Sequence, residues 1–159
     1  MTGSGRLGYS TAGWGGRERV VDPRCTEACG AVILAAEFRI AELSVSTACL
    51  YPDQAFRGRC LLTLREHSTE LFQLTPAVRT ALMNDVSRIA EALFRALHPI
   101  KMNYDLLGNL VPHIHWHVIP RFREDGMYPK PIWAGQPPPI TLAATERDAL
   151  IARIRQYLR

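Results

Sequence analysis

The spacing of apolar residues predicts one long amphipathic helix in the middle of the chain. Apolar residues recur at intervals of three and four after Thr75, which places them on one helical face. Thr75 suits the N-cap and Pro76 the first helical position, while His98 and Pro99 mark the end. The apolar face comprises Val78, Leu82, Val86, Ile89, Leu93 and Leu97. The opposite face, predicted to be solvated, carries Arg79, Asp85, Arg88, Glu91 and Arg95.

Shorter segments have the composition of β-strands. Residues 38–50 predict two short strands with a turn near Ser44, and residues 60–65 predict a third strand. Residues 101–107 predict a fourth strand, and a fifth runs through 113–119. A final helix begins near 145–148, and its predicted apolar face is Leu150, Ile154, Tyr157 and Leu158. A helix packed on one face of an antiparallel sheet of about five strands is an α+β fold.

The predicted fifth strand has an unusual polar face. Residues 113–118 read His-Ile-His-Trp-His-Val, and successive side chains of a strand point to opposite faces. The apolar residues therefore face a core, while His113, His115 and His117 line the other side, next-but-one neighbours roughly 6.5–7 Å apart. The chain has five histidines, so three in one row predict a functional site.

Imidazoles near neutral pH attack electrophiles, transfer protons or bind metals. Three ligands on one strand lie along a line, with the Cα atoms of His113 and His117 roughly 13–14 Å apart. At that separation the imidazoles of His113 and His117 cannot easily bind the same ion, because metal–nitrogen bonds are about 2 Å long. The row therefore favours a nucleophile with helpers, and a His-metal hydrolase stays an alternative.

Length and charge narrow the functional classes. A chain of 159 residues with net charge +4 fits one domain and an anionic ligand such as a nucleotide. The charge is too small and scattered to predict binding of DNA or RNA. No apolar run approaches the roughly 18–20 residues that span a bilayer, and no signal-peptide pattern opens the chain. A cytoplasmic protein with reduced cysteines is expected, with Cys49 and Cys60 packed as small apolar residues.

The N-terminal region differs in composition from the rest. Residues 1–23 are rich in Gly, Ser and Thr and predict a flexible leader, followed by a single domain over 24–159. The glycines around Trp14 lack the spacing of a dinucleotide-binding loop, which argues against a phosphate loop there.

The residues 113–119 carry a family resemblance. They match the His-φ-His-φ-His-φ-φ signature, in which φ is apolar, and the sequence resembles the histidine triad superfamily of nucleotide hydrolases and transferases. Asn109 and the Pro-Arg pair at 120–121 are similar to the bacterial diadenosine-polyphosphate-hydrolase-like branch. The likeness extends over residues 36–133, more than half of the chain.

The resemblance implies a mechanism that imidazole chemistry allows. His115 would attack the α-phosphorus of an adenosine-type nucleotide and form a nucleotidyl-histidine, which water then hydrolyses. His117 would contact the phosphate and assist the leaving oxygen, and His113 would orient and polarise the row. Asn109 would donate to the phosphate or the leaving group. No metal or other cofactor is required for this chemistry.

Further residues are implied at the substrate. Asn103 resembles an amide residue that some relatives use near the phosphate, although a polar edge residue is an alternative. Gly108 allows a turn and, with Asn109, offers backbone N–H groups to the phosphate. Dinucleoside polyphosphates, nucleoside phosphoramidates and nucleotidyl adducts are all possible substrates.

The loop after residue 50 resembles the part of the family fold that holds the ribose. Asp53 is the nearest candidate for the ribose-binding position if the loop is realigned, and an ungapped comparison places Tyr51 there. Asp53 is alternatively a turn-forming residue. Arg59 stands where many relatives have a His beside the base or phosphate, so it is a candidate substrate-binding residue.

A structural zinc site is a second implication of the resemblance. Some members hold zinc with an N-terminal Cys pair, a His after the central strand and the first His of the triad. Cys25, Cys29, His67 and His113 occupy comparable positions, with three residues between the cysteines where two are usual. The alternative is a pair of ordinary reduced cysteines.

The region 121–140 lacks periodicity and predicts an irregular segment. Arg121, Arg123 and Lys130 are either surface charges or residues that steer phosphates. The resemblance also implies a homodimer with the sheet extended across the interface. Two other classes of function stay open, a nucleotide-binding or sensing module with little turnover and the His-metal hydrolase.

Overall fold

A computed structural model describes residues 34–158. The predicted leader at 1–23 and the zinc candidates Cys25 and Cys29 lie outside the described residues. Within the described part of the chain, no helix is long and apolar enough to cross a membrane.

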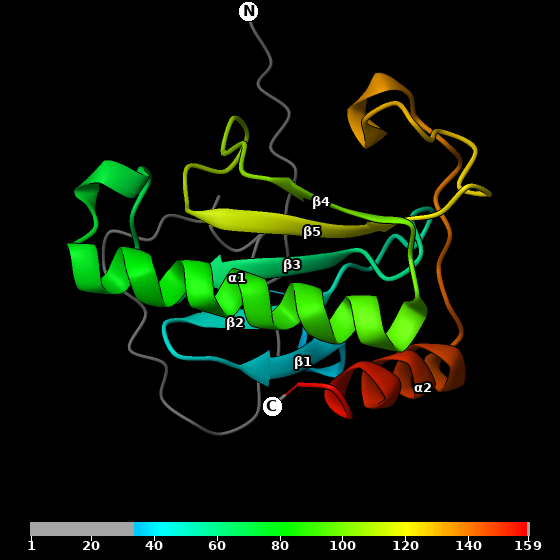
Figure 1. The fold of residues 1–159 in the computed structure, drawn as a ribbon, viewed down its shortest axis with the longest axis horizontal. Coiled ribbons are helices and arrows are strands. Elements are labelled where there is room, and N and C mark those ends of the chain that lie inside the picture. Colours follow the sequence, from blue (N-terminus) through cyan, green and yellow to red (C-terminus); the bar gives the residue numbers. More distant parts are fainter. Residues whose placement is uncertain (1–33, 159) are drawn as a thin grey trace, which may run out of the picture.

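The described residues form a five-stranded antiparallel sheet with two α-helices, which confirms the predicted α+β fold (Figure 1). The order of strands across the sheet is β1-β2-β3-β5-β4. The strands are β1 (Arg39–Glu42), β2 (Ser46–Leu50), β3 (Cys60–Leu64), β4 (Lys101–Asp105) and β5 (His115–Arg121). The helices are α1 (Pro76–Leu97) and α2 (Ala144–Arg155), with the 3₁₀ turns η2 (Ala36–Phe38), η3 (Leu71–Gln73) and η4 (Ile132–Ala134).

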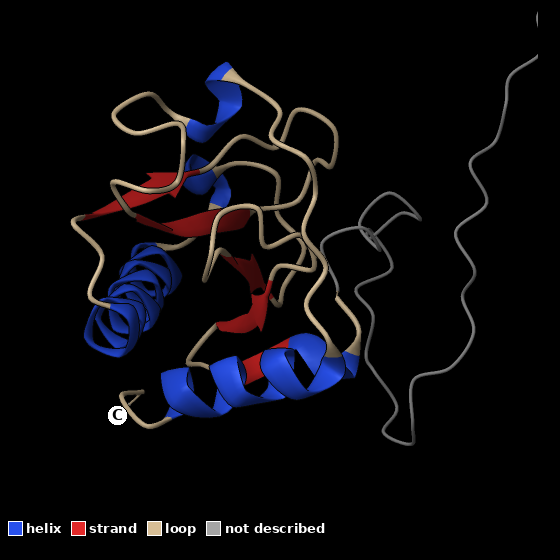
Figure 2. Cartoon of the chain, turned by 90° about the vertical axis from the view of Figure 1, so that its right-hand side faces the viewer, coloured by secondary structure: helices blue, strands red, loops and turns tan. Residues whose placement is uncertain are grey.

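Helix α1 begins and ends where its sequence predicts. The Oγ1 of Thr75 accepts a hydrogen bond from the backbone N–H of Val78 at 3.3 Å, and Pro76 is the first helical residue. His98 ends the helix in the left-handed conformation, with φ 53°. The helix crosses one face of the sheet, and Figure 2 views it nearly end-on beside the strands.

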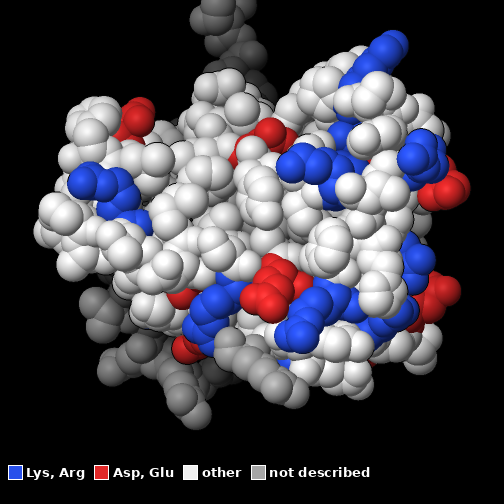
Figure 3. Space-filling view, viewed as in Figure 1, with Lys and Arg blue, Asp and Glu red and all other residues white. Residues whose placement is uncertain are grey.

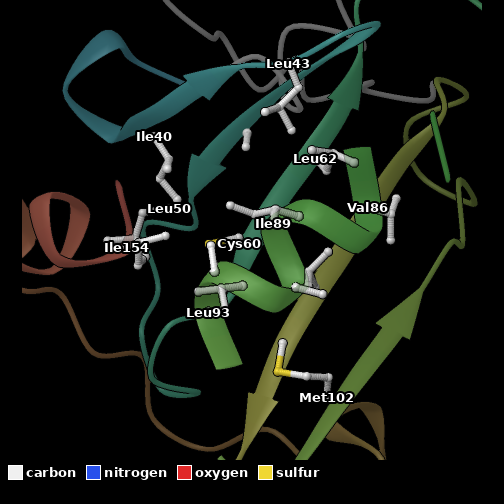
Figure 4. Packing of buried hydrophobic residues seen from close by; sticks show 14 of the residues in the cluster. Ile40, Leu43, Leu50, Cys60, Leu62, Val86, Ile89, Leu93, Met102 and Ile154 are labelled. Carbon is white, nitrogen blue, oxygen red and sulfur yellow. The ribbon is translucent and has the colours of Figure 1, made fainter. Parts of the chain in front are cut away.

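The main core lies between α1 and the sheet (Figure 4). Leu62 of β3 faces Ile89 and Leu93 of the helix, and Cys60 lies among them as a small apolar side chain, as predicted. Asp85 of α1, which was predicted to be solvated, is instead fully buried. Its carboxylate accepts hydrogen bonds from the N–H groups of the β1–β2 turn and from a serine hydroxyl. These bonds offset the cost of burying the charge.

Helix α2 packs against β1 and α1. Its buried residues are Leu150, Ile151 and Ile154, so the prediction of Leu150 and Ile154 is confirmed. The helix ends at Arg155, which leaves Tyr157 beyond its last turn and exposed, contrary to the predicted apolar face.

The other face of the sheet is covered by irregular chain. Ile119 of β5 packs there with Phe56, from the loop before β3, and with Ile132 of η4. The segment after β5 is irregular except for η4, as predicted, and Figure 1 shows it running along the right-hand end of the sheet to α2. The face seen in Figure 1 carries basic and acidic side chains interspersed rather than one continuous basic surface (Figure 3).

Candidate active site

The histidine row lies beside the centre of the sheet, where β5 is paired on both edges. His115 is opposite Thr63 of β3, while His117 is opposite Leu61 on one side and Asp105 on the other. β5 begins at His115, so His113 lies two residues before the strand instead of within it. All three side chains are buried, with exposed fractions of 3%, 6% and 7% along the row.

His115 has a defined proton position. Its Nδ1 lies 2.7 Å from the carbonyl oxygen of His113. A carbonyl only accepts hydrogen bonds, so Nδ1 carries the proton and Nε2 carries the lone pair in the neutral ring. No protein group within residues 34–158 hydrogen-bonds to that Nε2. The predicted nucleophile therefore has the tautomer that nucleophilic attack through Nε2 requires.

His117 is enclosed by rings and by one guanidinium group. Its ring centroid lies 5.3 Å from that of His115, 5.3 Å from that of Trp133 and 5.9 Å from that of Tyr51, all edge-on. The Nη2 of Arg59 lies 3.2 Å from its Nδ1. Burial, then the charge of Arg59, then His115 lower the pKa of His117 to about 3. His117 is therefore neutral at physiological pH.

His113 faces a different neighbourhood from the other two. Its Nε2 donates to the carbonyl oxygen of Leu64 at 2.7 Å, and its ring centroid lies 5.2 Å from that of His67. The structure thus brings together two of the four predicted zinc ligands. Because Nε2 of His113 is hydrogen-bonded to the carbonyl oxygen of Leu64, that nitrogen cannot bind a metal at the same time. Within residues 34–158, no group of three or more His, Cys, Asp or Glu residues is arranged to hold a metal ion.

Arg59 lies between two aromatic rings. Its guanidinium carbon is 4.0 Å from the ring centroid of Tyr51 and 5.0 Å from that of Trp133. The indole N–H of Trp133 donates to Asp105 at 3.0 Å, which connects the irregular segment to the end of β4. Sequence reasoning missed Trp133 and Asp105 as site residues. The sequence placed Asp105 inside the predicted strand 101–107 but gave no sign that it would pair with His117.

Two of the predicted substrate residues are engaged with the protein. One carboxylate oxygen of Asp53 accepts from the backbone N–H groups of Ala55, at 3.0 Å, and Ile140, at 2.9 Å. This is the turn-forming role that the sequence left open, with an added contact to the distant C-terminal segment. The Oδ1 of Asn103 accepts from Arg121 at 2.7 Å. A role for Asp53 at the ribose and for Asn103 at the phosphate stays a prediction.

The loop between β4 and β5 carries the remaining candidates. Gly108 has φ 71°, a left-handed conformation that favours glycine, so the predicted turn is confirmed. Asn109 follows with an exposed side chain. Its predicted contact with the phosphate or leaving group stays a prediction.

Arg121 differs from its predicted role. It is one of the largest fully buried side chains, and it pairs with Asp125, Nε to Oδ2, at 2.7 Å. Neither a surface charge nor a phosphate-steering role fits this burial. Arg123 and Lys130 are exposed, as a surface location predicts.

Comparison with known proteins gives a consistent result. The sequence profile of the HIT domain matches residues 35–124. A histidine triad protein from Bradyrhizobium japonicum is 30% identical, with TM-score 0.71 over 79% of this chain and 97% of the other. A histidine triad (HIT) protein from Sinorhizobium meliloti is 29% identical, with TM-score 0.71 over 76% of this chain and 89% of the other.

A Zn-bound histidine triad family protein from Mycobacterium smegmatis has the same fold, with 23% identity and TM-score 0.60 over 85% of this chain and 93% of the other. No curated protein matches the sequence. The profile match covers more than half of the chain and includes the whole histidine row. The chain therefore belongs to the HIT domain family.

Proposed function

We propose that this protein is a nucleotide hydrolase or nucleotidyl transferase that acts at the α-phosphate of an adenosine-type nucleotide, with His115 as the nucleophile. The observation that carries the proposal is the hydrogen bond from Nδ1 of His115 to the carbonyl oxygen of His113, 2.7 Å long. It directs the ring's lone pair to Nε2, the nitrogen without a protein partner among the described residues.

In the first step, Nε2 of His115 attacks the α-phosphorus and a P–N bond forms. The bond from phosphorus to the leaving group breaks, and its electron pair departs with the leaving group. Hydrogen-bond donors near the phosphate stabilise the charge that develops on its oxygens. His117 and Asn109 are the proposed donors, since His117 adjoins the nucleophile, with ring centroids 5.3 Å apart.

In the second step, water or another acceptor attacks the same phosphorus. The P–N bond breaks, its electron pair returns to Nε2 of His115, and the acceptor releases its proton to bulk water as the mononucleotide or new ester leaves. Both ring nitrogens of His115 thus end as they began, with the proton on Nδ1. Dinucleoside polyphosphates and nucleoside phosphoramidates are the proposed substrates, and no resident metal takes part.

The central experiment measures turnover and the covalent intermediate together. Wild type should release the fluorophore from a fluorogenic adenosine phosphoramidate, whereas His115→Ala should lose activity by several orders of magnitude. Mass spectrometry of quenched wild type should locate an adenylyl group on His115. His98→Asn is the matched control, because His98 is exposed and Asn tolerates its left-handed backbone. Equal rates for wild type and His115→Ala would refute the proposal.

A nucleotide-binding or sensing module is the second candidate. Tyr51 and Arg59 support it, because they depart from the residues that the resembled family commonly has at these positions. Saturable nucleotide binding without product release by wild type would favour the module over the enzyme.

A His-metal hydrolase fits the donor set less well. The Arg59 guanidinium, 3.2 Å from His117, places a positive charge beside any cation held by the row. The guanidinium also donates to Nδ1 of His117, so the proton of the neutral ring lies on Nε2. Neither ring nitrogen of His117 then has a free lone pair for a metal. Activity abolished by chelation while the fold survives would favour the metal.

Three further properties are proposed on the resemblance. A homodimer would extend the sheet through β4, which is an edge strand with exposed Tyr104. Light scattering after gel filtration tests this. Structural zinc would be held by Cys25, Cys29, His67 and His113, and elemental analysis of the purified protein tests that. A cytoplasmic location is the third property, tested by cell fractionation.

A further inference from the structure

Arg59 is held firmly at the edge of the histidine row. Its backbone N–H donates to Phe56 at 3.0 Å, and its carbonyl oxygen accepts from the backbone N–H of Tyr51 at 2.8 Å. Its side chain is 7% exposed and lies between the rings of Tyr51 and Trp133. A guanidinium confined in this way has a fixed direction, which makes its hydrogen bond to His117 informative.

That hydrogen bond determines where His117 carries its proton. The Nη2 of Arg59 lies 3.2 Å from Nδ1 of His117. A guanidinium group has five N–H donors, no acceptor, and keeps its charge in proteins, so Nδ1 of His117 must be the acceptor. A neutral imidazole with its lone pair on Nδ1 carries its proton on Nε2.

The neighbouring ring has the opposite arrangement. His115 donates from Nδ1 to a backbone carbonyl and keeps its lone pair on Nε2. The two ring centroids are 5.3 Å apart, and both residues project from the same face of β5, one with its lone pair on Nε2 and the other with its proton there. A phosphate seated there would meet a nucleophile and a hydrogen-bond donor together.

We propose that Arg59 is a positioning residue that fixes His117 as the Nε2–H tautomer, so that His117 donates a hydrogen bond to a phosphate oxygen while His115 attacks. The catalytic part of this proposal rests on the proposed function, whereas the tautomer belongs to the free protein. Arg59 thereby acts through His117, in contrast to the direct substrate contact predicted from the sequence.

The charge of Arg59 adds a preference for anionic ligands. No carboxylate within residues 34–158 forms an ion pair with it, and Asp53 and Asp105 act on it only as more distant charges. Its Nε is buried with no hydrogen-bond partner. A buried cation without a paired anion leaves a positive potential beside His117, which favours a phosphate over a neutral substrate.

The decisive measurement is the ¹⁵N NMR spectrum of the imidazole rings in ¹⁵N-histidine-labelled protein without ligand. Single His→Gln variants at 115 and 117 assign the signals. Wild type should show a protonated Nδ1 at His115 and a protonated Nε2 at His117. A protonated Nδ1 at His117 in wild type would overturn the proposal without any variant being made.

Arg59 variants test cause and effect. Arg59→Met, which keeps the apolar stem but has no donor, should allow the Nδ1–H tautomer of His117, and Arg59→Lys should restore Nε2–H in part. The titratable or charged groups that face His117 are His115, Tyr51, Asp105 and Arg59. Because the charge of Arg59 lowers the pKa of His117, that pKa should rise in Arg59→Met. An unchanged His117 pattern in folded Arg59→Met would refute the positioning role.

Kinetics separate this inference from the proposed function. With the adenosine phosphoramidate, Arg59→Met should lose kcat by on the order of 100-fold, more than KM changes, with partial rescue by Arg59→Lys. The adenylyl group should still form on His115. If Arg59→Met keeps the wild-type kcat although the proton of His117 has moved to Nδ1, the tautomer has no catalytic role. If wild type forms no adenylyl adduct on His115, the proposed function itself is refuted.

Discussion

Arg121 and Asp125 form a buried two-point ion pair at the end of β5. Nε of Arg121 donates to Oδ2 of Asp125 at 2.7 Å, and Nη2 of Arg121 donates to Oδ1 of Asp125 at 3.2 Å. The side chains of Arg121 and Asp125 are 1% and 4% exposed. Asp125 also accepts hydrogen bonds from three backbone N–H groups of the segment that follows β5. The pair therefore fixes the start of the segment that brings Trp133 to His117.

Removing one partner of this pair should destabilise the fold strongly. Asp125→Asn leaves the Arg121 charge buried without its anion, which costs roughly 3–5 kcal/mol of unfolding free energy. Urea denaturation measures the loss. The matched control is Asp148→Asn, which breaks the exposed Arg147–Asp148 pair and should cost about 0–1 kcal/mol. Similar losses for the two variants would contradict the role of burial.

The pKa of His117 predicts a pH dependence of stability. Its pKa is lowered to about 3 by burial, by Arg59 and by His115, whereas an unfolded His titrates near pH 6.5. Between these values the unfolded chain binds the extra proton, so the unfolding free energy falls as pH falls, by at most about 1.4 kcal/mol per pH unit. Urea titrations at pH 4 to 7 should show a shallower fall for His117→Gln. Parallel curves for the two proteins would exclude a depressed pKa.

The fold was predictable because its signals are local. The repeat of apolar residues in α1, its Thr75 cap and the Pro99 stop all act within a few residues of one another. Strand alternation likewise identified β5 and its polar face. The hydrogen bond that sets the tautomer of His115 is also local, because the His113 carbonyl oxygen that accepts it is two residues away, but it was found only in the structure.

The enclosure of the site was not predictable because it joins distant parts of the chain. Trp133 reaches Asp105 across 28 residues, and Arg59 reaches His117 across 58. Asp85 was misread as a solvated charge, and Arg121 as a surface charge or a phosphate-steering residue, because their partners are remote or lie in irregular chain. Helical or strand periodicity contains no information about such partners.

The ring of Trp133 should help to keep His117 neutral. It packs edge-on against His117 and excludes water from one side, and burial is the main cause of the lowered pKa. Trp133→Ala should therefore raise the pKa of His117 toward its ordinary value. Trp133→Phe keeps an aromatic ring and loses only the bond to Asp105, so its His117 should titrate close to wild type. NMR titration of the free proteins measures both, and equal shifts would indicate that the hydrogen bond matters more than the ring.

Gly58 should be essential for the stability of the loop that presents Arg59. It has φ 80°, and a Cβ there would lie 2.3 Å from Cδ1 of Leu97. Gly58→Ala should thus combine a conformational cost of roughly 1–2 kcal/mol with overpacking of roughly 1–3 kcal/mol. Gly126→Ala is the matched control, because Gly126 has φ 71° but nothing within 4 Å of the added Cβ. Urea denaturation should show the larger loss for Gly58→Ala, and an equal loss in both variants would mean that Leu97 moves aside at little cost.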